Sequence, residues 1–173
     1  KVWDFVNEVV KDVVSRYDFD AVHFDDYFYP YRIPGTPLPD SAAFADRGGV
    51  FYPDRIDEWR RHNVDTIIQI LSKTIKETKP WVKFGISPFG VWRNSVNDPM
   101  GSETSAGTTN YDALYADVIK WQREGWIDYL MPQLYWRESH SAAAYSTLAY
   151  WWNDYSYTGS MYYGLAPYRI DRK

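Results

Sequence analysis

Cysteine is absent from this 173-residue chain, which excludes a disulfide scaffold, a thiolate metal site and a cysteine nucleophile. The chain also has no apolar run near the roughly 18 residues of a membrane-spanning helix and no recognisable signal peptide, so we expect no transmembrane segment in it. Nineteen basic residues face 23 acidic ones, giving a net charge of −4, and the basic residues form no cluster. We therefore expect no nucleic-acid partner.

Motifs for nucleotides and metals are missing as well. The stretch "GISPFG", residues 85–90, is neither a GxGxxG turn nor a Walker loop. His, Asp and Glu show no metal-ligand spacing, so we expect neither a catalytic metal nor another cofactor. Aromatic residues, in contrast, are abundant at 19%, with 16 Tyr and 9 Trp. Such amphipathic rings indicate a solvated, ring-lined cleft in addition to a core.

The hydrophobic pattern predicts four helices that alternate with four strands. Apolar residues recur at three- and four-residue steps in the helical segments, and short apolar runs bounded by polar residues form the strands. The predicted order is helix 2–16, strand 21–26, helix 57–78, strand 82–89, a helix capped by Asn110 and stopped at Gly125, strand 129–136, a helix capped by Ser141, and strand 161–167.

Strict alternation predicts an α/β fold with parallel strands, either an open doubly wound sheet or a segment of a (β/α)8 TIM barrel. The connections that leave the first two strands, 29–56 and 89–109, are long, whereas those that enter the strands are short. Both architectures place ligand sites at the carboxyl ends of parallel strands, so these loops locate a site without choosing the fold. Because four strands cannot close an eight-stranded barrel, the barrel interpretation makes residues 1–173 one partial domain.

Side-chain alternation places candidate residues on the sheet face opposite the helices. His23, Asp25 and Tyr27 share that face, and Asp26 lies at the strand end, where alternation is least reliable. The same rule on the third strand turns Met131, Gln133 and Tyr135 inward and Leu130, Pro132 and Leu134 outward. A carboxylate, an amide and a phenol are thus predicted to meet at one mouth.

Glycoside cleavage is a chemistry that uses such a mouth. It needs one carboxyl group to protonate the leaving oxygen and a second group to support oxocarbenium-like charge. Two carboxyl groups at close quarters acquire different pKa values and hence different roles. We therefore name Asp25 and Asp26 as the catalytic candidates, one as general acid and one as stabiliser of the cation or of a substrate acetamido group. The pattern leaves open which does which, and leaves open a partner on another strand.

Four motifs carry a family resemblance: "FDDYFYPY", "GISPFGVWRNS", "YLMPQLYW" and "YYGLAPYRI". Together they resemble the glycosyl hydrolase-like 10 family of bacterial envelope (β/α)8 barrels, over essentially the whole chain. The resemblance implies a barrel segment that begins after the third strand, with three strands before Lys1 and one after Lys173. It also implies a polysaccharide substrate among bacterial cell-wall glycans, with peptidoglycan glycan strands favoured, and a location in the cell envelope or outside the cell.

A more distant likeness concerns the mechanism. "DFDAVHFDDYFYP" is similar to the fourth-strand motif DGxDxDxEYP of chitinase-type hydrolases, which use the acetamido group of the substrate as nucleophile. If side-chain parity is matched, His23, Asp25 and Tyr27 occupy the Asp, Asp and Glu places. If the terminal Tyr and Pro are matched instead, Phe28 falls on the catalytic Glu. The general-acid glutamate is absent either way, so Asp25 or Asp26 would have to replace it.

Further residues are candidates for binding substrate, each with a structural alternative such as core packing or loop bracing. Glu103 and Glu138 are reserve acid candidates. A barrel that binds glycan without cutting it is the alternative function, and hydrolysis of another bond, such as an amide, is a third. The predicted substrate-binding residues are His23, Tyr27, Trp92, Arg93, Asn94, Gln133, Tyr135 and Trp136.

Overall fold

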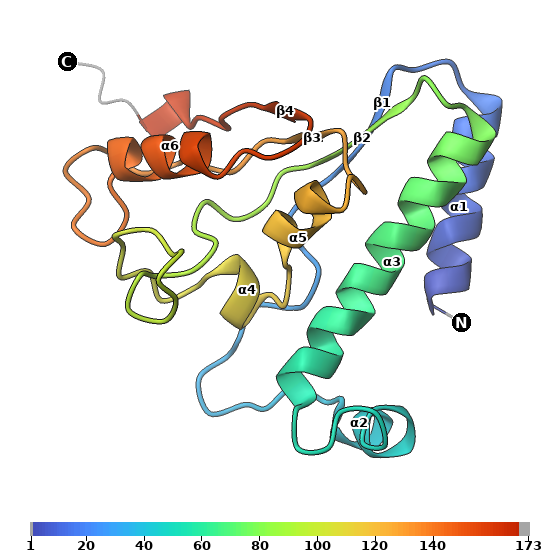
Figure 1. Ribbon diagram of the computed structural model, residues 1–173, viewed down its shortest axis with the longest axis horizontal. Coiled ribbons are helices and arrows are strands. Elements are labelled where there is room, and N and C mark those ends of the chain that lie inside the picture. Colours follow the sequence, from blue (N-terminus) through green and yellow to red (C-terminus); the bar gives the residue numbers. More distant parts are fainter. Residues whose placement is uncertain (1, 170–173) are drawn as a thin grey trace.

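The computed structural model describes residues 2–169, in which four parallel strands lie along one edge of the molecule with the helices beneath them (Figure 1). The long amphipathic segments predicted as helices 2–16 and 57–78 are helical, which confirms both. The strands are β1 Ala21–Phe24, β2 Lys83–Ile86, β3 Tyr129–Leu130 and β4 Ser160–Met161. The helices are α1 Val2–Arg16, α2 Ser41–Arg47, α3 Ile56–Thr78, α4 Asn110–Ala113, α5 Val118–Arg123, α6 Tyr145–Asp154 and the 3-10 turn η1 Pro167–Arg169.

The sheet runs in the order β1-β2-β3-β4, and each neighbouring pair is parallel. His23, Gly85 and Tyr129 stand side by side in the register. A doubly wound sheet reverses its strand order at a switch point. Within residues 2–169 the order contains no reversal, so this sheet grows in one direction, as sheets do when all crossovers lie on one face.

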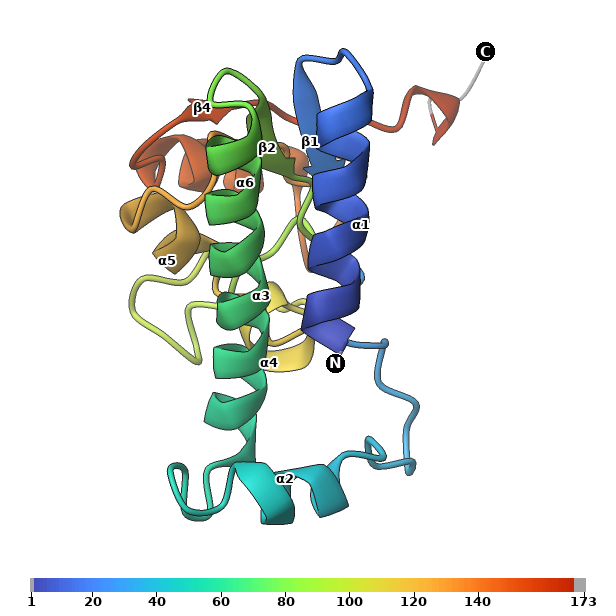
Figure 2. The same ribbon diagram turned by 90° about the vertical axis from the view of Figure 1, so that its right-hand side faces the viewer.

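The core fills the space between the sheet and the helices. Phe84, Ile86 and Leu130 are fully buried on the helix-facing side. The long helix α3 lies beside α1 (Figure 2) and adds Ile68 and Leu71, which are also fully buried. Their three-residue spacing gives α3 one continuous apolar face. No helix among the described residues is both long and apolar enough to cross a lipid bilayer.

The helix predicted from Asn110 to Gly125 is wrong in two respects. It is divided into α4 and α5, because Tyr115 between them has a positive φ of 56°, which no α-helix accommodates. Its cap is Thr109, whose side chain accepts a hydrogen bond from the Asp112 N–H. Asn110 is instead fully buried, and its amide donates to the carbonyl oxygens of the preceding loop, including Phe89 O at 2.6 Å. Asn110 therefore ties the loop after β2 to α4.

Other boundaries also differ from the prediction. The fourth predicted helix begins at Tyr145 rather than after Ser141, and Glu138 accepts hydrogen bonds from the N–H and hydroxyl of Ser146 in its first turn. All four strands are shorter than predicted. For β2 and β3 the cause is Pro88 and Pro132, which follow them closely and have no N–H for a ladder. The helix α2 within the first long connection carries no buried residue and was not predicted.

Candidate active site

Asp25 lies just beyond the carboxyl end of β1, exposed to solvent and held from two sides. Its Oδ1 accepts a hydrogen bond from the Gln133 amide Nε2 at 2.7 Å and another from the Asp26 N–H at 2.9 Å. The same Gln133 nitrogen donates to Ser87 O at 2.9 Å. Residues that follow three strands are therefore joined at one edge, and the predicted meeting of carboxylate and amide is present.

Asp26 has a different environment although it is the next residue. Its side chain is 3% exposed, and its Oδ2 accepts a hydrogen bond from the Tyr31 hydroxyl at 2.5 Å. Burial raises the pKa of Asp26, the hydrogen bond from Tyr31 lowers it in part, and the negative charge of Asp25 raises it again. No cation bonds this carboxyl group within residues 2–169, so its protonated form is favoured relative to an exposed aspartate.

Tyr135 and His23 complete the mouth. The pKa of Tyr135 is raised by burial first and then by the charges of Asp25 and other neighbours, which keeps its phenol protonated. His23 Nδ1 lies 3.0 Å from the Tyr129 hydroxyl, and the two rings stack with centroids 5.6 Å apart. Burial lowers the pKa of His23 while the charge of Asp25 acts to raise it, so the imidazole is neutral at pH 7. Neutral donors and acceptors thus surround Asp25.

Two of the predicted aromatic contacts remain near this edge. Tyr27 is 74% exposed, and its ring meets that of Tyr31 edge to face with centroids 6.1 Å apart. Trp136 is half-buried and packs edge to face on Phe89. A Cβ at Gly90 would collide with the Trp136 ring, so the glycine permits this close packing. Tyr27 therefore offers a free ring face, whereas Trp136 also closes the core.

In the second connection, the side chains of Trp92, Arg93 and Asn94 make packing and bracing contacts, which is the structural alternative named for them; their sugar contacts stay a prediction. Trp92 is 6% exposed and stacks on Trp151 within the core, with centroids 5.9 Å apart. Arg93 binds Asp112 through two nitrogens, at 3.1 and 2.8 Å, and also pairs with a second aspartate of its own loop. Asn94 is buried and exchanges hydrogen bonds with the backbone of residue 106. All three side chains hold the loop in place.

The two reserve acid candidates lie away from Asp25 and Asp26. Glu138 is exposed and caps the first turn of α6, as described above, and Glu103 is exposed in the loop after β2. Within the part of the chain that the structure describes, no three His, Cys, Asp or Glu side chains are grouped to hold a metal ion. Asp25 and Asp26 therefore remain the carboxyl groups that the sequence named for this edge.

An open cavity of about 1400 Å³ adjoins this edge. Its lining includes His23, Asp25 and Tyr27 from the end of β1, and it extends between α1 and α3 over mainly apolar side chains. A cavity lined by rings, with few polar groups at one end, is the usual form of a small-molecule or sugar site.

Comparison with known proteins identifies the family. The sequence profile described as Glycosyl hydrolase-like 10 matches residues 1–173. The chain belongs to the glycosyl hydrolase-like 10 family. Glycosyl hydrolase YngK of Bacillus subtilis (strain 168) is 50% identical over 170 residues, which cover 97% of this chain and 33% of that protein. Glycosyl hydrolase DigH of Escherichia coli (strain K12) is 45% identical over 172 residues, which cover 98% of this chain and 38% of that protein.

Membership of the glycosyl hydrolase-like 10 family confirms the resemblance drawn from the four motifs. The chain spans about a third of the length of these two relatives, both named glycosyl hydrolases. Within the family motifs, "FDDYFYPY" carries the two aspartates and "YLMPQLYW" carries Gln133 and Tyr135. The motif "GISPFGVWRNS" mainly supplies the braced loop.

Tyr31, Tyr129 and Ser87 belong to the site but were not predicted. Tyr129 shares the inward parity of Gln133, and Gly85 opposite it leaves room for its ring, because a Cβ there would collide with it. The inward parity of Tyr129, together with a glycine on the neighbouring strand, was a signal from which the sequence could have predicted it. For Tyr31 the sequence offers only its place in an aromatic run, five residues after Asp26. The loop folds back onto the end of its own strand, and no periodic pattern in the sequence marks such a contact.

Proposed function

We propose that this chain forms part of a (β/α)8-barrel glycoside hydrolase that cleaves a polysaccharide of the bacterial cell wall, with peptidoglycan glycan strands as the favoured substrate. The family and both relatives are named for glycoside hydrolysis, which supports the reaction class. We propose in addition that the barrel is closed, that the substrate is a cell-wall glycan, and that the protein is located in the cell envelope or outside the cell.

The asymmetry between Asp25 and Asp26 is the observation that carries the proposal. Two neighbouring carboxyl groups sit at the carboxyl end of a parallel sheet, one exposed and held by an amide, the other 3% exposed with a raised pKa. Glycosidases need one carboxyl group in each protonation state. We assign the proton store to Asp26 and the stabilisation of developing positive charge, or of a substrate acetamido group, to Asp25.

The geometry at Asp25 fits that role. Its Oδ1 is occupied by Gln133 and by the Asp26 N–H, which fixes the plane of the carboxylate. No hydrogen bond to the other oxygen is found within the described residues, and Asp25 is one of the residues that line the open cavity. A preorganised carboxylate beside the sugar C1 stabilises the transition state more than the ground state, because charge develops there only as the bond breaks.

Exposed apolar surface supports the barrel. Val2 and Phe5 on α1 are 76% and 70% exposed, and Val2 borders the open cavity. Large apolar side chains at this exposure mark a surface that another element covers. In the proposed barrel, preceding strands and helices cover it, and they also close the cavity beside Asp25.

The test uses the complete protein, meaning the proposed barrel with its strands on both sides of residues 1–173. It is incubated with peptidoglycan glycan strands stripped of their peptides and with chitin oligomers, while reducing ends and product masses are followed. We expect new reducing ends that disappear in Asp25→Asn and persist in Asp46→Asn, a matched change at an exposed aspartate on α2. Undiminished cleavage by Asp25→Asn would refute the assignment.

A glycan-binding barrel without catalysis is the second candidate, and two observations favour it. The carboxyl group with the raised pKa is covered by Tyr31, and the glutamate of chitinase-type motifs is absent. This candidate predicts oligosaccharide affinity that is lost in Tyr135→Phe, with no new reducing ends in any variant. Retained binding and absent cleavage by the folded parent protein would decide in its favour.

A further inference from the structure

The buried position of Asp26 raises a question about proton transfer. With 3% of its surface exposed, the carboxyl group cannot touch a glycosidic oxygen in the open cavity. The atom that covers it is the Tyr31 hydroxyl, 2.5 Å from Oδ2. Tyr31 as a whole residue is 41% exposed, and its ring packs on that of Tyr27, which lines the cavity, so Tyr31 lies beside the cavity.

We propose that Tyr31 is a further catalytic residue, whose hydroxyl relays the proton of Asp26 to the glycosidic oxygen of the substrate. This inference rests on the proposed glycosidase function. A phenol can accept one hydrogen bond while it donates another, so a single hydroxyl connects a donor behind it to an acceptor in front of it. In the structure the Tyr31 hydroxyl donates to Asp26 Oδ2, which is the bond of the carboxylate state. The relay uses the reversed bond, in which the protonated Asp26 donates to the Tyr31 oxygen.

The step balances in protons and electrons. The Tyr31 O–H bond transfers its proton to the glycosidic oxygen as the C1–O bond breaks, and the bonding electron pair leaves with that oxygen as an alcohol. At the same time the protonated Asp26 gives its proton to the Tyr31 oxygen, so the phenol is regenerated and Asp26 becomes a carboxylate. When water attacks C1 its proton returns by the reverse route. No phenolate accumulates, which agrees with the strongly raised pKa of Tyr31 that results from its burial and from Asp26.

Anchored neighbours hold Tyr31 in place. On one side Tyr29 packs edge to face on Tyr115, with centroids 5.0 Å apart. On the other side Arg32 donates to the Tyr115 hydroxyl at 2.5 Å, and Arg60 of α3 donates to the same oxygen at 2.8 Å. The loop is therefore fixed to the α4–α5 junction both before and after Tyr31. A relay needs this order, because proton transfer falls off steeply when donor and acceptor separate.

The competing explanation is that Tyr31 only caps Asp26. The two roles predict different pH profiles on denuded glycan strands in the complete protein. If Tyr31 only caps Asp26, Tyr31→Phe removes a hydrogen bond that lowers the pKa of Asp26, so this pKa rises. The basic limb of the kcat profile then moves to higher pH, and kcat stays nearly unchanged. If Tyr31 relays the proton, Tyr31→Phe lowers kcat about 100-fold or more and abolishes the basic limb of the kcat profile.

We expect the second result, with Asp26→Asn losing the same limb and the double variant no slower than the slower single variant. Tyr150→Phe, at an exposed tyrosine on α6, controls for loss of a hydroxyl and should match the parent. A dinitrophenyl glycoside needs no proton on its leaving group, so Tyr31→Phe should cleave it within about fivefold of the parent rate. A shifted limb with retained kcat, or equal losses on both substrates, would overturn the relay. A parent protein that cleaves no glycan would instead refute the proposed function itself.

Discussion

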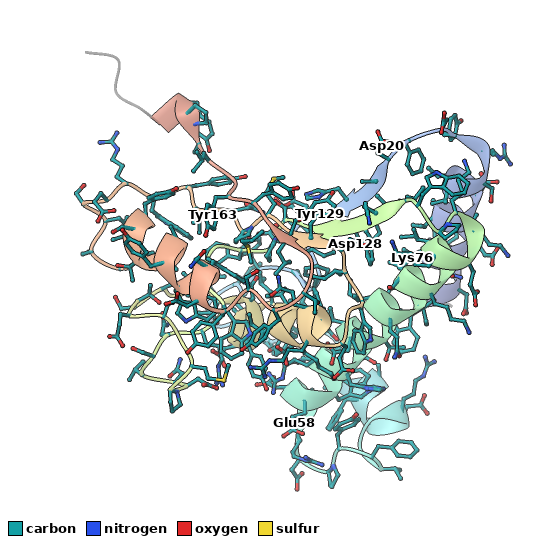
Figure 3. All side chains as sticks on the ribbon, turned by 45° about the horizontal axis from the view of Figure 1, so that its top comes forward. Asp20, Glu58, Lys76, Asp128, Tyr129 and Tyr163 are labelled. Carbon is teal, nitrogen blue, oxygen red and sulfur yellow. The ribbon has the colours of Figure 1, made fainter. Side chains whose placement is uncertain are left out.

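Two aspartates at opposite edges of the same sheet show how environment decides the role of a carboxyl group. Asp26 follows the carboxyl end of β1, and Asp128 precedes β3 at the amino edge, where Lys76 of α3 reaches it (Figure 3). Burial acts to raise the pKa of both. At Asp128, Lys76 and the Phe84 N–H, each 2.7 Å away, outweigh burial and lower the pKa. At Asp26 no cation from residues 2–169 opposes burial, and the pKa rises.

The difference separates a structural carboxylate from a carboxyl group whose environment suits the proposed proton transfer. Asp128 ties α3 and β2 to β3 in its charged form, because the Lys76 ammonium also donates to the Val82 carbonyl at 2.9 Å. Asp26 forms no ion pair within residues 2–169. It lies beside a second carboxyl group, at the sheet edge where parallel α/β proteins have their ligand and active sites. A carboxyl group that is buried without a positive partner is costly, and such cost concentrates at functional sites.

The largest expected difference between Asp26 and Asp128 is the effect of their substitution on kcat. In the complete protein, Asp26→Asn removes the stored proton and should lower kcat on glycan about 10²- to 10⁴-fold. Asp128→Asn, the matched change at the opposite edge, should leave kcat within about threefold once the folded fraction is corrected. Initial rates of reducing-end release at 25 °C provide the measurement. A similar loss in both variants would show that the two edges do not differ in function.

The second expected effect is on stability, where substitution of Asp128 should have the larger effect and substitution of Asp26 the smaller. Asp128→Asn removes charge-assisted hydrogen bonds from Lys76 and leaves its ammonium without a carboxylate, which should cost about 2 kcal/mol of unfolding free energy. Urea unfolding followed by far-UV circular dichroism measures this. Lys76→Met, which removes the cation instead, should cost a similar amount. Unchanged midpoints in both variants would contradict the structural role of the pair.

A smaller effect concerns the orientation of Asp25. Gln133→Ala removes the amide that donates to Asp25 at 2.7 Å, and water replaces it at this exposed position. Loss of about one hydrogen bond in the transition state should lower kcat/KM about tenfold. Gln69→Ala, at an exposed glutamine of α3, is the matched control. Steady-state kinetics on soluble glycan oligomers give the ratio, and an unaltered kcat/KM would remove Gln133 from the site.

The smallest expected effect is the pH dependence of stability, which has opposite signs at the two edges. The lowered pKa of Asp128 contributes stability that is present above the unfolded pKa, near 3.9, and is lost as pH falls through the folded value. The raised pKa of Asp26 favours the fold below the unfolded pKa, and this contribution is lost as pH rises through the folded value.

Asp26→Asn should therefore be slightly more stable than the parent at pH 7, by less than about 1 kcal/mol, and this advantage should vanish below about pH 4. Thermal unfolding across this pH range measures the difference. Asp46→Asn, at an exposed position, should show no such trend. A gain that grows toward acid would reverse the sign and contradict the raised pKa.

Sequence reasoning succeeded where a pattern repeats. The helices 2–16 and 57–78 were predicted because apolar residues recur over several turns, and the meeting of Asp25 with Gln133 followed from strand alternation. It failed where one residue departs from a pattern. The positive φ of Tyr115 divides a helix that looks continuous. Trp92 suits by residue type either a stacking platform or a plug over the core, and the structure packs it against Trp151 in the core.

The sequence by itself determined the alternation of helices and strands, the parallel sheet and the face on which each strand residue lies, because these depend on local periodicity. Only the tertiary structure decided that Asp26 is buried beneath Tyr31 while Asp128 meets Lys76. The pKa of a carboxyl group depends on desolvation and on charges within a few ångströms. Those neighbours come from elements far apart in the chain, such as α3 and β3, so no short stretch of sequence contains them.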